Sequence, residues 1–143
     1  MLTYITLGSN NLARAKQSYD ALFTSIGVAR TSDLQKGGAS WVFDTGTGQR
    51  NNLVILSPED GRPASVGNGT LVGLLMANHH QVDAIHAAAL KLGGSSEGEP
   101  GLRETNAGGT YIVYLRDPEG HKFAAYTTVT PELAASGDLR RIR

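Results

Sequence analysis

The sequence has no cysteine, no excess of either charge and no long apolar run. Without cysteine, disulfides, thiolate nucleophiles, zinc–thiolate sites and iron–sulfur clusters are all excluded. Thirteen basic and thirteen acidic residues give a formal net charge of zero, and without a basic face a nucleic-acid-binding role is not expected. No segment approaches membrane-spanning length and no secretory signal is visible, so we expect a cytoplasmic protein that does not act at a membrane.

What the chain does have is the profile of one soluble globular domain, with 143 residues of which 40% are hydrophobic. A chain of this length buries roughly 70% of the surface that its unfolded form exposes. It therefore needs neither a metal nor a disulfide to fold, and a bound metal ion would serve chemistry.

Hydrophobic periodicity in the first half predicts a strand, a helix and three further strands. Asn11 and the two residues before it offer side-chain oxygens to cap the helix, and Gly27 is placed to end it. A connector without periodicity, residues 57–63, follows. The predicted elements are a strand at 3–8, a helix at 12–26 and strands at 28–32, 39–44 and 52–56.

The second half repeats this order, with Asn78 as the helix cap and Gly93-Gly94 closing the helix. Its strands are predicted at 70–76, 102–105, 110–116 and 121–127. Aligning the halves pairs Gly27 with Gly94, and residues 40–43 with 110–113, which indicates an internal structural repeat. We therefore expect an α+β fold of paired βαβββ modules.

These elements divide the chain into a single domain, residues 1–127, and a C-terminal tail. Module one is expected at about 1–60, a linker at 57–69, module two at about 70–127 and the tail at 128–143. The tail is expected to hold a short helix at 131–136 and a solvated arginine-rich end.

One βαβββ unit has a helix on only one face of its sheet, so the other face stays bare. Two units whose bare faces curve toward each other would form a concave cup. A cup lined by side chains is the default place for a ligand.

Several motifs together resemble those of a known family. They are residues 1–8, residues 11–15 with Tyr19, residues 67–70, residues 82–89 and Arg116-Asp117-Pro118-Glu119-Gly120. They resemble the vicinal oxygen chelate superfamily, the group of glyoxalases, bleomycin-resistance proteins and extradiol dioxygenases such as dihydroxybiphenyl dioxygenase. The resemblance covers residues 1 to about 127. It implies the paired βαβββ fold, commonly as a homodimer, with a divalent metal held in the cup.

The resemblance also implies where the metal ligands should stand. The position on the first strand carries Tyr4, that of the second module Leu71, that of the last strand Ala124, and a fourth falls near Ile55. Three of these side chains cannot bind a metal, and a lone tyrosine is a poor site for a divalent ion. We therefore expect neither a metal ion nor another cofactor.

Side chains two residues apart on a strand share a face, so Tyr4 is grouped with Thr6, and Ala124 with Tyr126. The aromatic residues of the middle strands belong to sets of the same kind, and the pattern leaves open which set of each strand lines the cup. Aromatic side chains there would stack on a planar ligand, although ordinary sheet core is the better explanation for any single one. The residues expected to bind a ligand are Tyr4, Thr6, Trp41, Phe43, Leu71, Ile112, Tyr114, Ala124 and Tyr126.

Titratable side chains offer weaker candidates. His121 follows the DPxG turn, and we place it at the rim of the cup, as a candidate general base or ligand contact. Support of the turn explains this histidine at least as well. Asp117 is assigned to the turn itself, because aspartate opening a Pro-x-Gly turn is what turn chemistry requires. His79, Asp83 and His86 have helical spacings that would allow a metal patch, but an exposed helix start is the better reading.

The sequence thus predicts a homodimeric protein that binds a small, partly aromatic molecule in its cup without a metal. Three alternatives stay open. One is a divalent-metal-dependent lyase or dioxygenase of the same superfamily. Another is a metal-independent enzyme that uses Tyr4, His121 or Arg103 as acid, base or anion clamp. The third is a regulatory module with a filled cup.

Overall fold

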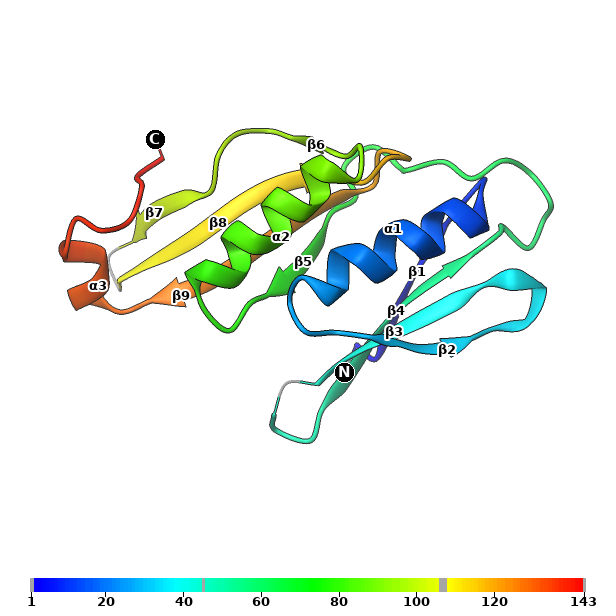
Figure 1. Cartoon of the computed structure of the whole chain (residues 1–143), viewed down its shortest axis with the longest axis horizontal. Coiled ribbons are helices and arrows are strands. Elements are labelled where there is room, and N and C mark those ends of the chain that lie inside the picture. The colour runs from blue at the N-terminus through cyan, green and yellow to red at the C-terminus, as the bar shows by residue number, and fades with distance from the viewer. Residues whose placement is uncertain (1, 45, 106–107, 143) are drawn as a thin grey trace. The chain divides into compact units, whose positions relative to one another are not determined.

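The computed structural model describes residues 2–44, 46–105 and 108–142. It contains two compact units, Met1–Asn68 and Gly69–Arg143, here called unit 1 and unit 2. In each unit one long helix packs on one face of a mixed sheet (Figure 1). The boundary between the units falls within the predicted linker.

Unit 1 has the order strand, helix, three strands. Its sheet has the strand order β1-β4-β3-β2, in which β1 and β4 are parallel and the other neighbours antiparallel. The connector after the last strand completes the unit. The elements are β1 (Tyr4–Gly8), α1 (Leu12–Thr24), β2 (Arg30–Asp33), a 3-10 turn (Gln35–Gly37), β3 (Ala39–Asp44) and β4 (Arg50–Leu56).

Unit 2 repeats this topology with one added two-residue strand, so the predicted α+β fold of paired βαβββ modules is confirmed. Its first strand is parallel to its last, β5 to β9, and β8 lies antiparallel beside β9. Both β6 and β7 pair with the far edge of β8. The elements are β5 (Val72–Leu75), α2 (His79–Lys91), β6 (Ser95–Ser96), β7 (Gly101–Thr105), β8 (Gly108–Arg116), β9 (Lys122–Val129) and α3 (Pro131–Ala135).

The two long helices begin in the same way. The side chain of Asn11 accepts a hydrogen bond from the backbone N–H of Arg14, and that of Asn78 accepts one from Gln81, at 3.0 and 3.1 Å. Each satisfies one of the helix's unpaired N–H groups. Both helices then run for 13 residues. The predicted caps are confirmed, and the two helices match in their cap and in their length.

The C-terminal tail is part of unit 2 and does not extend freely into solvent. Its short helix α3 matches the prediction, and Leu139 beyond it is buried. The N–H of Leu102 on β7 donates to the carbonyl of Arg140 at 2.6 Å, and the N–H of Ile142 donates back to Leu102 at 3.1 Å. The arginine side chains at 140 and 141 are exposed as expected, and Arg143 lies outside the described residues.

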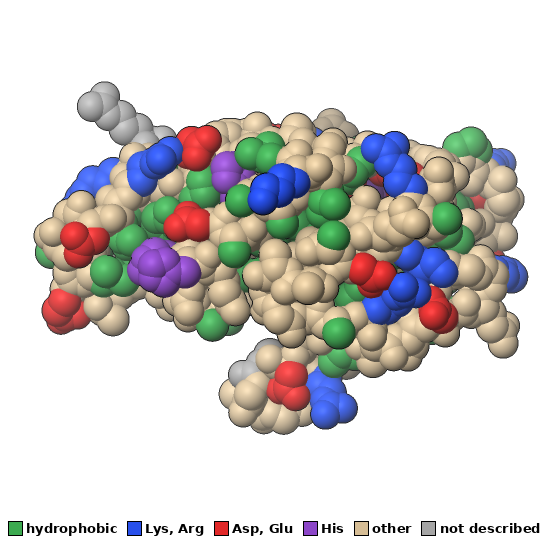
Figure 2. All heavy atoms as spheres, viewed as in Figure 1, with side chains coloured by type: hydrophobic (Ala, Val, Ile, Leu, Met, Phe, Trp, Pro, Cys, Tyr) green, Lys and Arg blue, Asp and Glu red, His purple; other side chains and the backbone are tan. Residues whose placement is uncertain are grey.

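Charged side chains of both signs are interspersed over the face of the molecule drawn in Figure 2. Within the described ranges, no helix is both long enough and apolar enough to cross a bilayer.

Candidate functional site

The sheet of unit 1 has one face covered by α1. Phe23 of α1 contacts the rings of Trp41 and Phe43 on β3, with centroids 5.7 and 5.1 Å apart. The side of β3 that carries these two rings is therefore the helix side, and we call the opposite side the helix-free face of unit 1. The strand register places on that face Tyr4, Thr6 and Gly8 of β1, Asn52, Val54 and Leu56 of β4, and Ser40 and Val42 of β3.

Two predicted ligand-binding residues of β1 lie on this helix-free face. Tyr4 and Thr6 pair with Asn52 and Val54 of β4. The side chain of Tyr4 is 62% exposed, which is high for a large ring in a sheet. The alternation predicted for β1 is thus present, and ligand binding by these residues stays a prediction.

Trp41 and Phe43 were expected to line the cup, and that expectation is wrong. Trp41 is fully buried, and its ring lies 5.5 Å from that of Tyr19 on α1. Its indole N–H donates to Asp20 at 3.2 Å. Phe43 shares the helix side and packs edge-on against Phe23. Both rings belong to the core beneath α1.

Unit 2 also has a helix-free face, opposite α2. The hydroxyl of Tyr111 on β8 donates to Asp83 of α2 at 2.9 Å, so the side of β8 that carries Tyr111 is the helix side. The register places on the helix-free face Arg103 of β7, Thr110, Ile112, Tyr114 and Arg116 of β8, Lys122, Ala124 and Tyr126 of β9, and Gly73 and Leu75 of β5.

The predicted set in unit 2 is brought together by this register. Tyr114 pairs with Ala124, and Ile112 pairs with Tyr126. These four residues are neighbours on the helix-free face, where Ile112 and Ala124 are buried and the two tyrosines are half-buried. Leu71, the fifth predicted residue in this unit, directly precedes β5 and is exposed.

Cationic groups surround Tyr114. The guanidinium carbon of Arg103 lies 5.3 Å from the ring centroid, and the ammonium of Lys122 lies 5.4 Å from it. Glu97 pairs with Lys122 at 2.7 Å and with Arg116 at 3.2 Å. The hydrogen bond from Lys122 and the nearby charges hold the pKa of Glu97 below its usual value. The carboxylate is therefore ionised at neutral pH.

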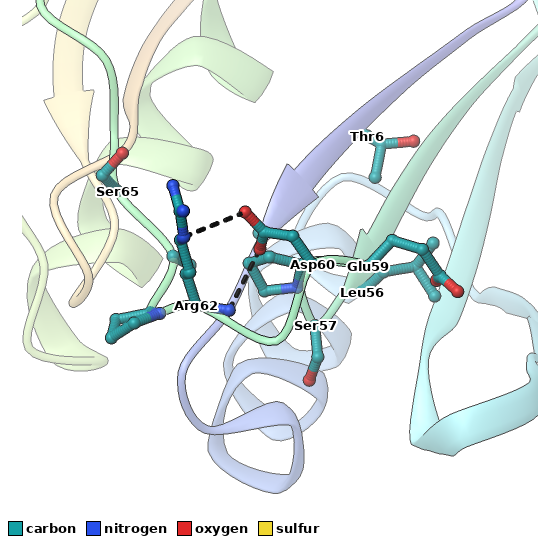
Figure 3. Close-up of a pocket in the computed structure, with 11 residues that line it drawn as sticks. Thr6, Leu56, Ser57, Glu59, Asp60, Arg62 and Ser65 are labelled. Carbon is teal, nitrogen blue, oxygen red and sulfur yellow. Dashed lines mark hydrogen bonds and ion pairs between the residues drawn. The ribbon is translucent and has the colours of Figure 1, made fainter.

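A pocket of about 540 Å³ lies at the carboxyl ends of β1 and β4 in unit 1. Thr6, Gly8 and Leu56, all on the helix-free face, line one side of it. The rest of its lining comes from the connector, residues 57–60 and 62–65, with Asp60 and Arg62 paired at one end (Figure 3). The pocket joins apolar surface to hydroxyl and charged groups.

Two hydrogen bonds join the connector to Asn10, in the loop between β1 and α1. The side-chain oxygen of Asn10 accepts from the N–H of Ala64 at 2.7 Å, and its amide donates to the carbonyl of Ala64 at 3.1 Å. Gly8 permits this approach, because a Cβ there would lie 2.9 Å from the Cβ of Ala64. No sequence pattern predicted this pocket, because its wall depends on contacts 54 residues apart.

Solved structures with the same fold include one similar in sequence. A glyoxalase/bleomycin resistance protein from Albidiferax ferrireducens matches at a TM-score of 0.76 and 32% identity, over 89% of this chain and 98% of that one. The chain belongs to the glyoxalase/bleomycin resistance protein family. No family model matches it, and no curated protein matches it either.

More distant members of this family show the fold alone. A glyoxalase/bleomycin resistance protein/dioxygenase family enzyme from Burkholderia phytofirmans matches at a TM-score of 0.65 and 16% identity, over 89% of this chain and 98% of that one. A lactoylglutathione lyase from Agrobacterium tumefaciens matches at 0.60 and 17%, over 89% and 92%. Neither carries an activity over to this member of the family.

The metal positions of the glyoxalase family do not fit a metal in this chain. Ile55 is buried on the helix side, so the fourth expected position is not on the helix-free face. Ala124 and Leu71 have no donor atoms, and Tyr4 offers a single phenol. Among the residues that the structure describes, no group of three or more His, Asp or Glu side chains could hold a metal ion. We derive no step through a metal.

His121 differs from the rim position that we expected in this family member, because it is only 6% exposed. Its backbone N–H donates to the carboxylate of Asp117 at 2.8 Å, and its carbonyl accepts from the N–H of Asp117 at 3.1 Å. Asp117 also accepts from the N–H of Glu119 at 3.0 Å. The structural role predicted for Asp117 is confirmed, and the turn encloses His121.

The helix α2 of this family member does not present a metal patch. Asp83 accepts from Tyr111, and the buried His86 lies 3.0 Å from the hydroxyl of Ser96. His79 stacks near His80 at the start of the helix. Burial, together with the hydrogen bond to Asp83, raises the pKa of Tyr111 to about 12. Tyr111 is therefore a structural group and not an acid poised near neutral pH.

Asn52 is a functional candidate that sequence reasoning missed. It lies on the helix-free face of unit 1, between Tyr4 on β1 and Val42 on β3. Its side-chain oxygen is buried and has no hydrogen-bond partner, alone among such atoms in the described part of the chain. A buried unpaired amide oxygen is costly, so its presence beside Tyr4 is consistent with a ligand donor that completes it.

Proposed function

We propose that this member of the glyoxalase/bleomycin resistance protein family binds a small, partly aromatic molecule on the helix-free face of a sheet, without a metal ion. One observation carries the proposal. The helix-free faces present large, exposed side chains, such as Tyr4 in unit 1 and Leu75 in unit 2, at 62% and 65% exposure. Contiguous exposed apolar surface marks binding sites, and these side chains are our candidates for such surface.

The residue types favour binding over chemistry. Tyr114 and Tyr126 offer ring faces and hydroxyl groups on unit 2, while Asn52 offers an unpaired amide oxygen on unit 1. Tyrosine combines a large apolar area with a polar tip, which suits a planar ligand with a few polar groups. On the described portion of either face, no nucleophile stands within hydrogen-bond distance of a base, so we favour holding a ligand over transforming it.

The two enzyme alternatives receive less support. A metal-dependent lyase or dioxygenase requires ligands at positions that hold Tyr4, Leu71 and Ala124. A metal-independent enzyme with His121 as its base requires contact between that side chain and the ligand, and its burial opposes this. Tyr4 remains accessible and is therefore the residue to test for activity.

Thermal-shift measurements against planar aromatic compounds and against Zn²⁺, Ni²⁺, Mn²⁺ and Fe²⁺ test the proposal. A compound that binds the native state raises the melting temperature by mass action. We expect planar compounds to raise it with and without EDTA, and Tyr114→Leu to reduce the shift. Leu90→Ala is the control, because Leu90 is exposed on α2. A shift produced by metal ions alone would contradict the proposal.

We also propose that the chain forms a homodimer. The support is the exposed apolar residues of the helix-free faces, such as Leu75, together with the dimers that the family resemblance implies. Light scattering coupled to size exclusion should give twice the mass of one chain at micromolar concentration. The mass of one chain would rule this out.

A further inference from the structure

The helix-free face of unit 2 carries more positive than negative charge. Arg103, Arg116 and Lys122 lie on it by strand register. Among the described residues, the one carboxylate paired with any of these three is Glu97, which contacts Lys122 and Arg116. The surplus cation is therefore Arg103.

Arg103 is held in place without using its hydrogen-bonding capacity. Its guanidinium lies over the Tyr114 ring at 5.3 Å from the centroid, a contact that uses the face of the cation. In the part of the chain that the structure describes, no carboxylate or carbonyl accepts a hydrogen bond from it. A guanidinium has five N–H donors in a planar fork that matches a carboxylate.

Lys122, the second cation near Tyr114, is less available. Its ammonium is 2.7 Å from Glu97 and its side chain is largely shielded, whereas Arg103 is exposed. An anion that approaches the ring therefore meets Arg103 as the unpaired partner. Lys122 adds long-range attraction from the same face.

We infer that the ligand is an anionic planar molecule, an aromatic carboxylate, whose carboxylate pairs with Arg103 while its ring lies on the Tyr114 side of the face. The inference deepens the proposed function and rests on it. An arginine–carboxylate pair is frequently bidentate and about twice as strong as a neutral hydrogen bond. A planar fork stacked on a ring also resists replacement by lysine.

The test compares 2-naphthoate with its neutral amide, 2-naphthamide, by isothermal titration calorimetry on the full chain. We expect naphthoate to bind at least about tenfold more tightly, because a hydrogen bond to a charged group gains more than a neutral one. Raising the salt concentration should weaken naphthoate and leave naphthamide unchanged. Equal affinities for the two compounds overturn the inference.

Variants test whether Arg103 causes the preference for naphthoate over naphthamide. Arg103→Gln should remove the preference for naphthoate and keep the naphthamide affinity, and Arg103→Lys should keep only part of the preference. Arg140→Gln is the control, because Arg140 is an exposed arginine paired with Glu99 at 3.2 Å, and the substitution changes the net charge equally. A preference that survives in Arg103→Gln overturns the assignment.

The outcomes separate this inference from the proposed function. If both compounds bind equally and Arg103→Gln changes neither, planar binding stands and the anion site fails. If neither compound binds and the broader planar panel gives no thermal shift, both fail. Melting temperatures of the variants, measured without ligand, show whether each is folded.

Discussion

At the scale of single residues, Asn52 is a position where we expect one substitution to change both stability and ligand binding. Its buried oxygen lacks a partner, unlike any other such side-chain atom in the described ranges. Leaving a buried acceptor unpaired costs about 1–3 kcal/mol. The free protein should therefore be less stable than it need be at this position.

Asn52→Val should raise the free energy of unfolding by about 1 kcal/mol, since it removes the unpaired amide and adds a residue that favours strands. Urea denaturation measures the change. The same variant should weaken the binding of any planar compound held on the helix-free face of unit 1. Asn51→Val is the matched control, because the neighbouring amide contacts Gln49 at 3.4 Å. A loss of stability in Asn52→Val, with unchanged binding, would contradict this role.

Asp117 has the opposite character, since its carboxylate accepts hydrogen bonds from the backbone N–H groups of Glu119 and His121 in the turn. Asp117→Ala should lower the free energy of unfolding by about 1–3 kcal/mol, because two backbone N–H groups lose their acceptor. Asp117→Asn keeps one oxygen and should lose less. Chemical denaturation of the unsubstituted protein and of the two variants measures these losses of stability. Equal midpoints would show that the carboxylate is dispensable.

The sequence located some site residues and misplaced others for a physical reason. Alternation states which residues share a face, and it correctly grouped Tyr4 with Thr6 on one face of β1. For Trp41 and Phe43 the alternation of β3 did not show which face packs against the helix. A large aromatic ring suits the core as well as a ligand site. The alignment of the halves already paired Trp41 with Tyr111, and both prove to face a helix.

At the scale of elements, a hydrogen bond from the hydroxyl of the buried Tyr111 to Asp83 joins β8 to α2. The folded-state pKa of Tyr111 is raised to about 12, above the ordinary value of 10.0, first by burial and then by Asp83. A raised folded pKa means that the stabilising contribution is complete below pH 10 and is lost as pH rises toward 12. Deprotonation places two negative charges together.

The stability of the protein should therefore fall between pH 10 and pH 12, and Tyr111→Phe should reduce that slope. Thermal melts across this range measure it. The variant should also be somewhat less stable at neutral pH, because Asp83 loses a donor. Tyr126→Phe, on the helix-free face, serves as the control for general tyrosine ionisation. An unchanged slope in Tyr111→Phe would contradict the assignment.

Elements with strong local signals were predictable, and those fixed by distant contacts were not. The asparagine caps and the apolar periodicity gave both helices, and the turn residues gave most strands. The two-residue strand β6 has too few side chains to form a pattern. The alignment paired Gly27 with Gly94, but the left-handed glycine after α2 is Gly93, with φ of 83° against 80° at Gly27. Gly94 instead packs closely on Arg116.

At the scale of the whole molecule, the chain repeats one βαβββ topology in two units, each with a helix-free face. The family membership accounts for this architecture. The side chains at the expected metal positions are not a set that binds a metal ion. We therefore predict that this protein uses the fold of the glyoxalase family to hold an organic ligand.

The most direct test is a thermal-shift titration of the EDTA-treated protein with planar aromatic carboxylates, with Zn²⁺, Ni²⁺, Mn²⁺ and Fe²⁺ titrated in parallel. If the protein binds a planar ligand without a metal, the melting temperature should rise in a dose-dependent way with at least one carboxylate. It should not rise with any of the metal ions. A rise with a metal ion at stoichiometric concentration, together with no response to any planar compound, would contradict metal-free binding of a planar ligand.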